Sequence, residues 1–134
     1  MSWKSKIVTE KFQNAIKNRK KICIFDVETT GLSKDKDRIV QFSAIIAEPN
    51  QYGIYQETSF LDLYIKQPVY MTQQVINIHH ITNEFLEDKP MESEVVNEIY
   101  NFLKKADFIS GYNIARFDIA FLDKMLGRFG IEEK

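Results

Sequence analysis

Apolar and polar positions recur along the chain with two different periods, and these periods predict its secondary structure. Short apolar runs that end in turn residues predict β-strands, whereas apolar residues three and four positions apart predict amphipathic helices. The predicted strands are residues 21–27, 39–47, 58–66 and 107–111, and the predicted helices are residues 1–20, 72–78, 93–106 and 116–129. Residues 82–85 have the character of a further helix start, which Pro90 would interrupt.

The order of these elements favours a mixed sheet with helices packed on it, which is an α/β (α+β) fold. The first three strands are joined by short turns, so we expect them to pair antiparallel. We expect one domain over residues 21–134, preceded by a basic helical extension over residues 1–20. The two long helices should bury their apolar stripes against the sheet. Those stripes are Val95, Ile99, Phe102 and Leu103 in one helix, and Ile119, Leu122, Met125, Leu126 and Phe129 in the other, which Gly130 would end.

Composition and charge narrow the class of protein. A chain of 134 residues, 44% of them hydrophobic, can bury one core. Residues 1–21 hold seven Lys or Arg and one acid, Glu10, whereas the other 113 residues hold eleven basic and eighteen acidic side chains. The acidic body suits a metal site better than a general phosphate-binding surface. The basic face of the extension is expected to be solvated, with a nucleic-acid contact as the alternative.

Cysteine usage and hydropathy favour a cytoplasmic protein. Cys23 is the only cysteine, so no internal disulfide can form, and its apolar neighbours predict a core thiol. No apolar run reaches the length of a membrane span, and the N-terminal segment lacks the apolar region of a signal peptide. We therefore expect a cytoplasmic location without membrane contact.

Two carboxylates end the first predicted strand. Asp26 and Glu28 are two positions apart, so their side chains would project from the same face. Adjacent carboxylates repel each other and resist burial unless a cation lies between them, and a divalent metal prefers oxygen ligands. A polar strand end that faces water is the simpler interpretation of these two residues alone.

A third carboxylate, Asp118, lies in the first turn of the last predicted helix, just after Asn113 in the preceding turn. An acid at this position also stabilises the helix dipole, which is the simpler interpretation of Asp118 alone. Together with Asp26 and Glu28, however, it predicts a shared metal site.

These residues resemble motifs of the DEDD 3′–5′ exonucleases, a ribonuclease-H-like family, and most resemble the proofreading subunit or domain of bacterial DNA polymerase III. The first motif is residues 25–32, Phe-Asp-Val-Glu-Thr-Thr-Gly-Leu. A linking segment resembles residues 78–86, and the second motif resembles Gly-Tyr-Asn at 111–113 followed by Phe117 and Asp118. The resemblance covers roughly residues 21–130 and implies a ribonuclease-H-like fold.

The resemblance implies a two-metal hydrolysis of phosphodiester bonds at the 3′ end of DNA, with Mg²⁺ or Mn²⁺ as the ions. Asp26 and Glu28 would hold one ion, Asp26 would bridge to the second, and Asp118 would bind the second directly or through water. For the substrate, the resemblance implies contacts from the backbone at Thr29 and Thr30, from Leu32 to the terminal base, and from Asn113. The implied partners are a single-stranded 3′ end of DNA, with RNA open as an alternative, and DNA polymerase subunits.

The chain departs from the family pattern after Asp118. The family's third motif supplies a histidine base and a last aspartate, but only 16 residues follow Asp118 and none is histidine. Tyr112 also stands where the second motif often has histidine. We expect His79 and His80 to be loop histidines rather than a substitute base, and Asp123 to be a surface acid. The fold is therefore expected to be C-terminally incomplete, and exposed apolar surface should favour self-association.

Two further interpretations stand beside the exonuclease. One is a catalytically incomplete exonuclease-like module that binds a polymerase subunit or nucleic acid, and the missing third motif motivates it. The other is a structural protein whose acidic residues are incidental, which would require both motifs to be coincidence.

Overall fold

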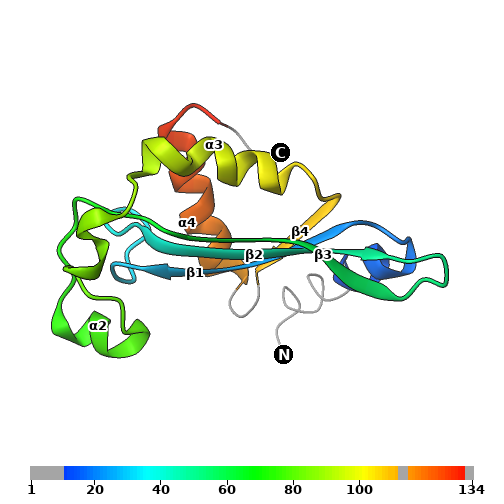
Figure 1. Cartoon of the computed structure of the whole chain (residues 1–134), viewed down its shortest axis with the longest axis horizontal. Helices are drawn as coiled ribbons and strands as arrows, with labels where there is room; N and C mark the ends of the chain where they lie inside the picture. The colour runs from blue at the N-terminus through cyan, green and yellow to red at the C-terminus, as the bar shows by residue number, and fades with distance from the viewer. Residues whose placement is uncertain (1–10, 112–114, 132–134) are drawn as a thin grey trace.

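The computed structural model describes residues 11–111 and 115–131, and these form a four-stranded mixed sheet with helices packed on it (Figure 1). The strands are β1 (Ile22–Thr29), β2 (Ile39–Pro49), β3 (Tyr55–Tyr64) and β4 (Phe108–Gly111), in the order β3-β2-β1-β4. β1 pairs antiparallel with β2, as β2 does with β3, whereas β4 lies parallel to β1. The predicted mixed sheet and its antiparallel pairing are confirmed.

β3 lies at 55–64, which corrects the predicted strand at 58–66. The early start follows from a tight hairpin turn, in which the Asn50 side-chain oxygen accepts hydrogen bonds from the backbone N of Tyr52 at 2.8 Å and of Ile54 at 3.0 Å. Pairing therefore resumes at Tyr55. At the other end, Lys66 leaves the strand and forms an isolated bridge with Met91.

The helices expected at 72–78, 93–106 and 116–129 are confirmed, with ends shifted by one to three residues. They are α2 (Gln73–His79), α3 (Glu92–Leu103) and α4 (Ala115–Arg128). The helix start predicted at 82–85 is a short 3₁₀ helix instead, η1 (Phe85–Asp88), and the Thr82 hydroxyl accepts a hydrogen bond from the backbone N of Phe85. Of the predicted helix at 1–20, residues 11–17 are helical, and residues 1–10 lie outside the described residues.

The core lies between α3, α4 and the sheet face that carries Cys23, Phe25 and Val27. All four apolar residues predicted for the stripe of α3 are buried, as are Leu122, Met125 and Leu126 of α4. Two predictions for the last helix are wrong, because Ile119 is 37% exposed and Phe129 is 39% exposed. The buried stripe of α4 starts at Asp118 rather than at Ile119, and Phe129 lies beyond the last helical residue. Gly130 follows with a positive φ of 75°, which fits its predicted role as the helix stop.

The opposite face of the sheet is covered at one end by the helical residues 11–17. Phe12 packs edge-to-face on Phe108 of β4, with ring centroids 6.1 Å apart. The Tyr55 hydroxyl donates a hydrogen bond to the Lys20 carbonyl at 2.7 Å, just after this helix. The described part of the N-terminal segment therefore packs on the sheet. In the described residues we find no helix both long and apolar enough to cross a membrane.

Candidate active site

Asp26 and Glu28 lie at the end of β1, on the face away from the main core. Phe25 and Val27, which alternate with them, are buried beneath α3 and α4. In the described register, β4 pairs with β1 only as far as Phe25 with Gly111. Among the described residues, no strand pairs with β1 beyond Phe25 on the β4 side.

α4 approaches this edge. Figure 1 shows α4 running transverse to the strands, from the level of β1 up to α3. Its later turns pack into the core through Leu122 and Met125, whereas its first turn carries Asp118 to Asp26. Asp118 is only 3% exposed, and its carboxyl group lies close enough to that of Asp26 for the two to interact. Its Oδ2 atom is buried without a hydrogen-bond partner among the described residues.

The three carboxylates repel one another. Burial and the charges of Asp26 and Glu28 raise the pKa of Asp118 to about 7. Burial and the charge of Asp26 also raise the pKa of Glu28. Near neutral pH the site therefore binds a proton that a cation would displace.

The donor set fits a hard divalent cation. Asp26, Glu28 and Asp118 offer only carboxylate oxygens, which Mg²⁺ and Mn²⁺ prefer, and the buried Oδ2 of Asp118 still needs a partner. As the side chains stand, no group of three His, Cys, Asp or Glu residues within the described ranges is arranged to hold a metal. Binding of one metal ion by all three carboxylates would therefore require them to move closer together.

A pocket of about 310 Å³ opens beside these carboxylates. Asp26, Glu28 and Asp118 line it together with apolar side chains, among them Leu32, Val75, Ile78 and Phe117. Leu32 is 86% exposed and Ile78 is 74% exposed. A pocket that joins acids to exposed apolar side chains has the chemistry to bind a metal-bridged phosphate and a flat base.

The turn after β1 is closed by its own side chains. The Thr29 hydroxyl donates to the Gly31 carbonyl at 2.6 Å, and the Thr30 hydroxyl donates to Asp37 Oδ1 at 2.8 Å. A Cβ on Gly31 would lie 2.5 Å from Asp37 Oδ2, so this position has no room for a side chain. The two threonine hydroxyls therefore shape the turn.

His79 also lines the pocket, and both of its ring nitrogens are engaged. Nδ1 accepts a hydrogen bond from the backbone N of Ile81 at 3.1 Å, so Nε2 carries the proton and donates to the Thr29 carbonyl at 3.2 Å. Burial lowers the pKa of His79 and so favours this neutral form. The expectation that His79 is structural rather than a base agrees with this geometry. His80 is exposed and caps α2 with φ of 63°.

The structure brings together most of the residues singled out from the sequence. Asp26, Glu28, Thr29, Leu32 and Asp118 line one pocket, Thr30 supports it from the adjoining turn, and Asn113 lies outside the described residues. Asp123 is exposed, as expected. The pocket is also lined by Val75, Ile78 and Phe117, which no sequence pattern singled out as lining residues. The one sequence signal for Ile78 was its place at the start of residues 78–86, which resemble the family's linking segment.

A comparison with protein families decides what kind of chain carries this pocket. The model of the RNase_T exonuclease family matches residues 23–134. The chain belongs to this exonuclease family. The family membership inferred from the motifs is therefore confirmed.

Relatives of this exonuclease chain include two DNA polymerases III of the PolC type. The protein from Pediococcus pentosaceus is 37% identical over 114 residues, which cover 84% of this chain. The protein from Staphylococcus haemolyticus is 33% identical over 107 residues, which cover 80% of it. The chain spans only 7% of the length of either relative.

Solved structures with the same fold include exonuclease I. The E. coli enzyme in complex with a dT13 oligonucleotide matches with a TM-score of 0.70 and 22% identity, over 84% of this chain and 24% of that one. Exonuclease I from Methylocaldum szegediense matches with a TM-score of 0.68 and 23% identity, over 81% of this chain and 23% of that one. The predicted ribonuclease-H-like α/β fold is confirmed.

Proposed function

We propose that residues 21–134 form a metal-dependent 3′–5′ exonuclease unit of the DNA polymerase III proofreading type. The observation that carries this proposal is the position of Asp118. Its carboxyl group is buried, lies against Asp26 and has one oxygen without a partner among the described residues, at a pocket that also holds Glu28. In a member of an exonuclease family, such a group of acids would bind the divalent ions that hydrolysis requires.

The proposal gives the acids separate roles. Asp26 and Glu28 would hold one Mg²⁺ or Mn²⁺ ion, and Asp26 and Asp118 would hold a second. Bound divalent ions supply an activated water and stabilise the charge on the leaving 3′ oxygen. The chain's own contribution is to keep Asp118 dehydrated beside Asp26 and to release its proton near neutral pH.

The same pocket supplies substrate contacts in this proposal. Leu32 would pack on the terminal base, and the backbone at Thr29 and Thr30 would hold the nucleotide, with Asn113 as a further contact. The exposure of Leu32 at the mouth of the pocket supports the first of these roles. Ile78, also exposed, would provide a second apolar contact.

The relatives favour DNA as the substrate. Two are DNA polymerases, and a structure with the same fold holds a dT13 oligonucleotide. We therefore propose a single-stranded 3′ end of DNA as the substrate, with RNA as the competitor to test, and a polymerase as the partner. This role would place the chain in the cytoplasm. Self-association stays a prediction, which sedimentation over a range of concentrations would test.

A second function is a non-catalytic binding module of the same fold. It is favoured by the full engagement of both ring nitrogens of His79, because neither nitrogen is then available to act as a general base. Such a module would bind the 3′ end or a polymerase without cleaving DNA.

Digestion of a 5′-labelled single-stranded oligonucleotide separates the two functions. With Mg²⁺ or Mn²⁺, the exonuclease proposal expects a ladder that shortens from the 3′ end, and a loss of more than about 100-fold in Asp26→Ala and Asp118→Asn. Asp123→Asn is the matched control, because Asp123 is an exposed acid on the same helix as Asp118. Binding without cleavage would support the module, and unchanged cleavage in Asp26→Ala would overturn the exonuclease site. A labelled RNA in parallel identifies the preferred substrate.

A further inference from the structure

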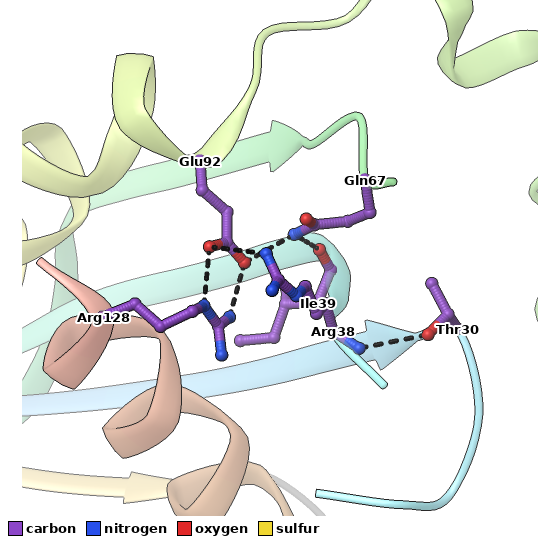
Figure 2. A network of polar contacts seen from close by, with 6 residues as sticks. All are labelled: Thr30, Arg38, Ile39, Gln67, Glu92 and Arg128. Atoms are coloured by element: carbon purple, nitrogen blue, oxygen red, sulfur yellow. Dashed lines mark hydrogen bonds and ion pairs between the residues drawn. The ribbon is translucent and has the colours of Figure 1, made fainter. Parts of the chain in front are cut away.

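Glu92 is a buried acid outside the pocket. It lies in the first turn of α3 and is 5% exposed. Its carboxylate accepts two hydrogen bonds from Arg128, from Nε at 2.9 Å and from a terminal guanidinium nitrogen at 2.6 Å (Figure 2). Gln67 donates a further hydrogen bond at 2.7 Å, and an Arg38 guanidinium nitrogen lies 3.8 Å away. The Glu92 carboxylate thus links its own helix, α3, to the three other segments that carry Arg128, Gln67 and Arg38.

One branch of this network leads to the turn that follows β1. Arg38 and Thr30 are joined by two hydrogen bonds, from the Thr30 backbone N to the Arg38 carbonyl at 2.9 Å and from the Arg38 backbone N to the Thr30 hydroxyl at 3.1 Å. Figure 2 shows the second of these bonds beside the Arg38 contact with Glu92. The turn closed in this way, residues 30–38, carries Gly31 and Leu32, which line the pocket.

The other branch leads to α4. Arg128 is the last residue of this helix, and Asp118 lies in its first turn. A helix of this length moves largely as a rigid rod, so the anchor at Arg128 restricts the direction in which the first turn points. Gln67 adds a third link, because its amide also donates to the Ile39 carbonyl at the start of β2.

We propose that Glu92 is a positioning residue. It fixes the position of the 30–38 turn relative to α4 at the candidate active site. This proposal rests on the proposed exonuclease function. Glu92 does not line the pocket, so it acts on the pocket through the residues that it contacts, chiefly Arg38 and Arg128. The bidentate contact of Arg128 with the buried Glu92 carboxylate gives the fixed geometry that such a role needs.

Hydrogen exchange tests the coupling without any need for activity. Glu92→Gln keeps the size of the side chain but removes its charge, and Glu98→Gln is the matched control, because Glu98 is exposed on the same helix. In Glu92→Gln we expect the amides of Thr30 and Arg38 to exchange at least about 10-fold faster, while those of Phe42 and Ile46 in β2 stay protected. Unchanged exchange at Thr30 and Arg38 in a folded Glu92→Gln protein would overturn the proposal.

Arg38→Gln keeps the test decisive if Glu92→Gln does not fold. This variant removes only the branch to the turn and leaves Glu92 paired with Arg128. In Arg38→Gln the Thr30 amide should exchange faster, whereas amide exchange in the last turn of α4 should be unchanged. If the Thr30 amide of the Arg38→Gln protein exchanged as slowly as in the unmodified chain, this result would overturn the proposed coupling.

Kinetics then separate positioning from simple stabilisation. Below its melting transition, Glu92→Gln should raise KM for a 3′-ended oligonucleotide about 10-fold with a smaller change in kcat, because the displaced turn carries the proposed substrate contacts. An ion pair that only stabilises the fold would lower Tm and leave KM unchanged, and that result would overturn the positioning role. If the unmodified chain does not cleave DNA, the proposed function fails, and the exchange experiment still decides whether Glu92 couples the turn to α4.

Discussion

The buried carboxyl group of Asp118 lies against that of Asp26 where the first turn of α4 meets the end of β1. Burial and the charges of Asp26 and Glu28 raise the pKa of Asp118 to about 7 and so favour its protonated form. The pair therefore makes the site sensitive to pH in the range where the chain is proposed to work.

The stability of the metal-free protein should fall as the pH rises from about 4 to about 7. The pKa of Asp118 is raised from its usual 3.8 to about 7, so the folded state binds more protons than the unfolded state over this range. The contribution of the protonated Asp118 to stability is complete below its unfolded-state pKa of 3.8. It is lost as the pH rises through its folded-state pKa of about 7. The free energy of unfolding, measured with urea at a series of pH values, should fall by at most about 1.4 kcal/mol per pH unit because of this group.

Asp118→Asn should flatten this slope, whereas the exposed Asp123→Asn should leave it unchanged. Equal slopes in the unmodified chain and Asp118→Asn would show that Asp118 does not hold the proton. Added Mn²⁺ should stabilise the unmodified protein more at pH 8 than at pH 5, because protons compete with the metal for the same oxygens.

Gly31→Ala should disrupt the turn beside the pocket. The added Cβ would lie 2.5 Å from Asp37 Oδ2, and the displaced Asp37 would lose its hydrogen bonds with the Thr30 hydroxyl and the Ser33 backbone N. We expect a loss of about 1–3 kcal/mol in the free energy of unfolding, together with weaker oligonucleotide binding. Gly127→Ala is the control, because a Cβ there would contact nothing within 4 Å. Equal stability of the two variants would contradict the crowding at Gly31.

Cys23 should be inert in the folded protein. Burial raises the pKa of its thiol to about 12, and the side chain is fully buried, so almost no thiolate is present or accessible near neutral pH. A thiol-reactive dye should label the chain only in denaturant. Rapid labelling of the folded protein, measured by mass spectrometry, would contradict the burial of Cys23.

Local patterns in the sequence predicted most of the fold and of the site. The period of two along β1 separates Asp26 and Glu28 from the core residues Phe25 and Val27. Asp118 was also expected in the first turn of a helix, where the structure places it. These predictions depend on residues that are close together in the sequence.

The parts that could not be predicted depend on long-range contacts. Glu92 precedes the helix predicted at 93–106 and gives no sign of burial until Arg128, 36 residues later, is placed beside it. The inward position of Asp118, rather than of Ile119, depends on how α4 packs against the end of β1, which no local pattern indicates. The role of Ile78 at the pocket likewise requires α2 to be placed against the end of β1.

Calorimetric titration with Mn²⁺ above pH 7 tests most directly the central claim that these acids form a metal site. The measurement compares the unmodified chain with Asp26→Ala and Asp118→Asn, and with Asp123→Asn as the matched exposed acid. Binding by the unmodified chain and Asp123→Asn, with a loss of at least about 10-fold in affinity in the other two, is the predicted result. Equal binding by the unmodified chain and Asp26→Ala, or no binding by either, would contradict a metal site at Asp26, Glu28 and Asp118.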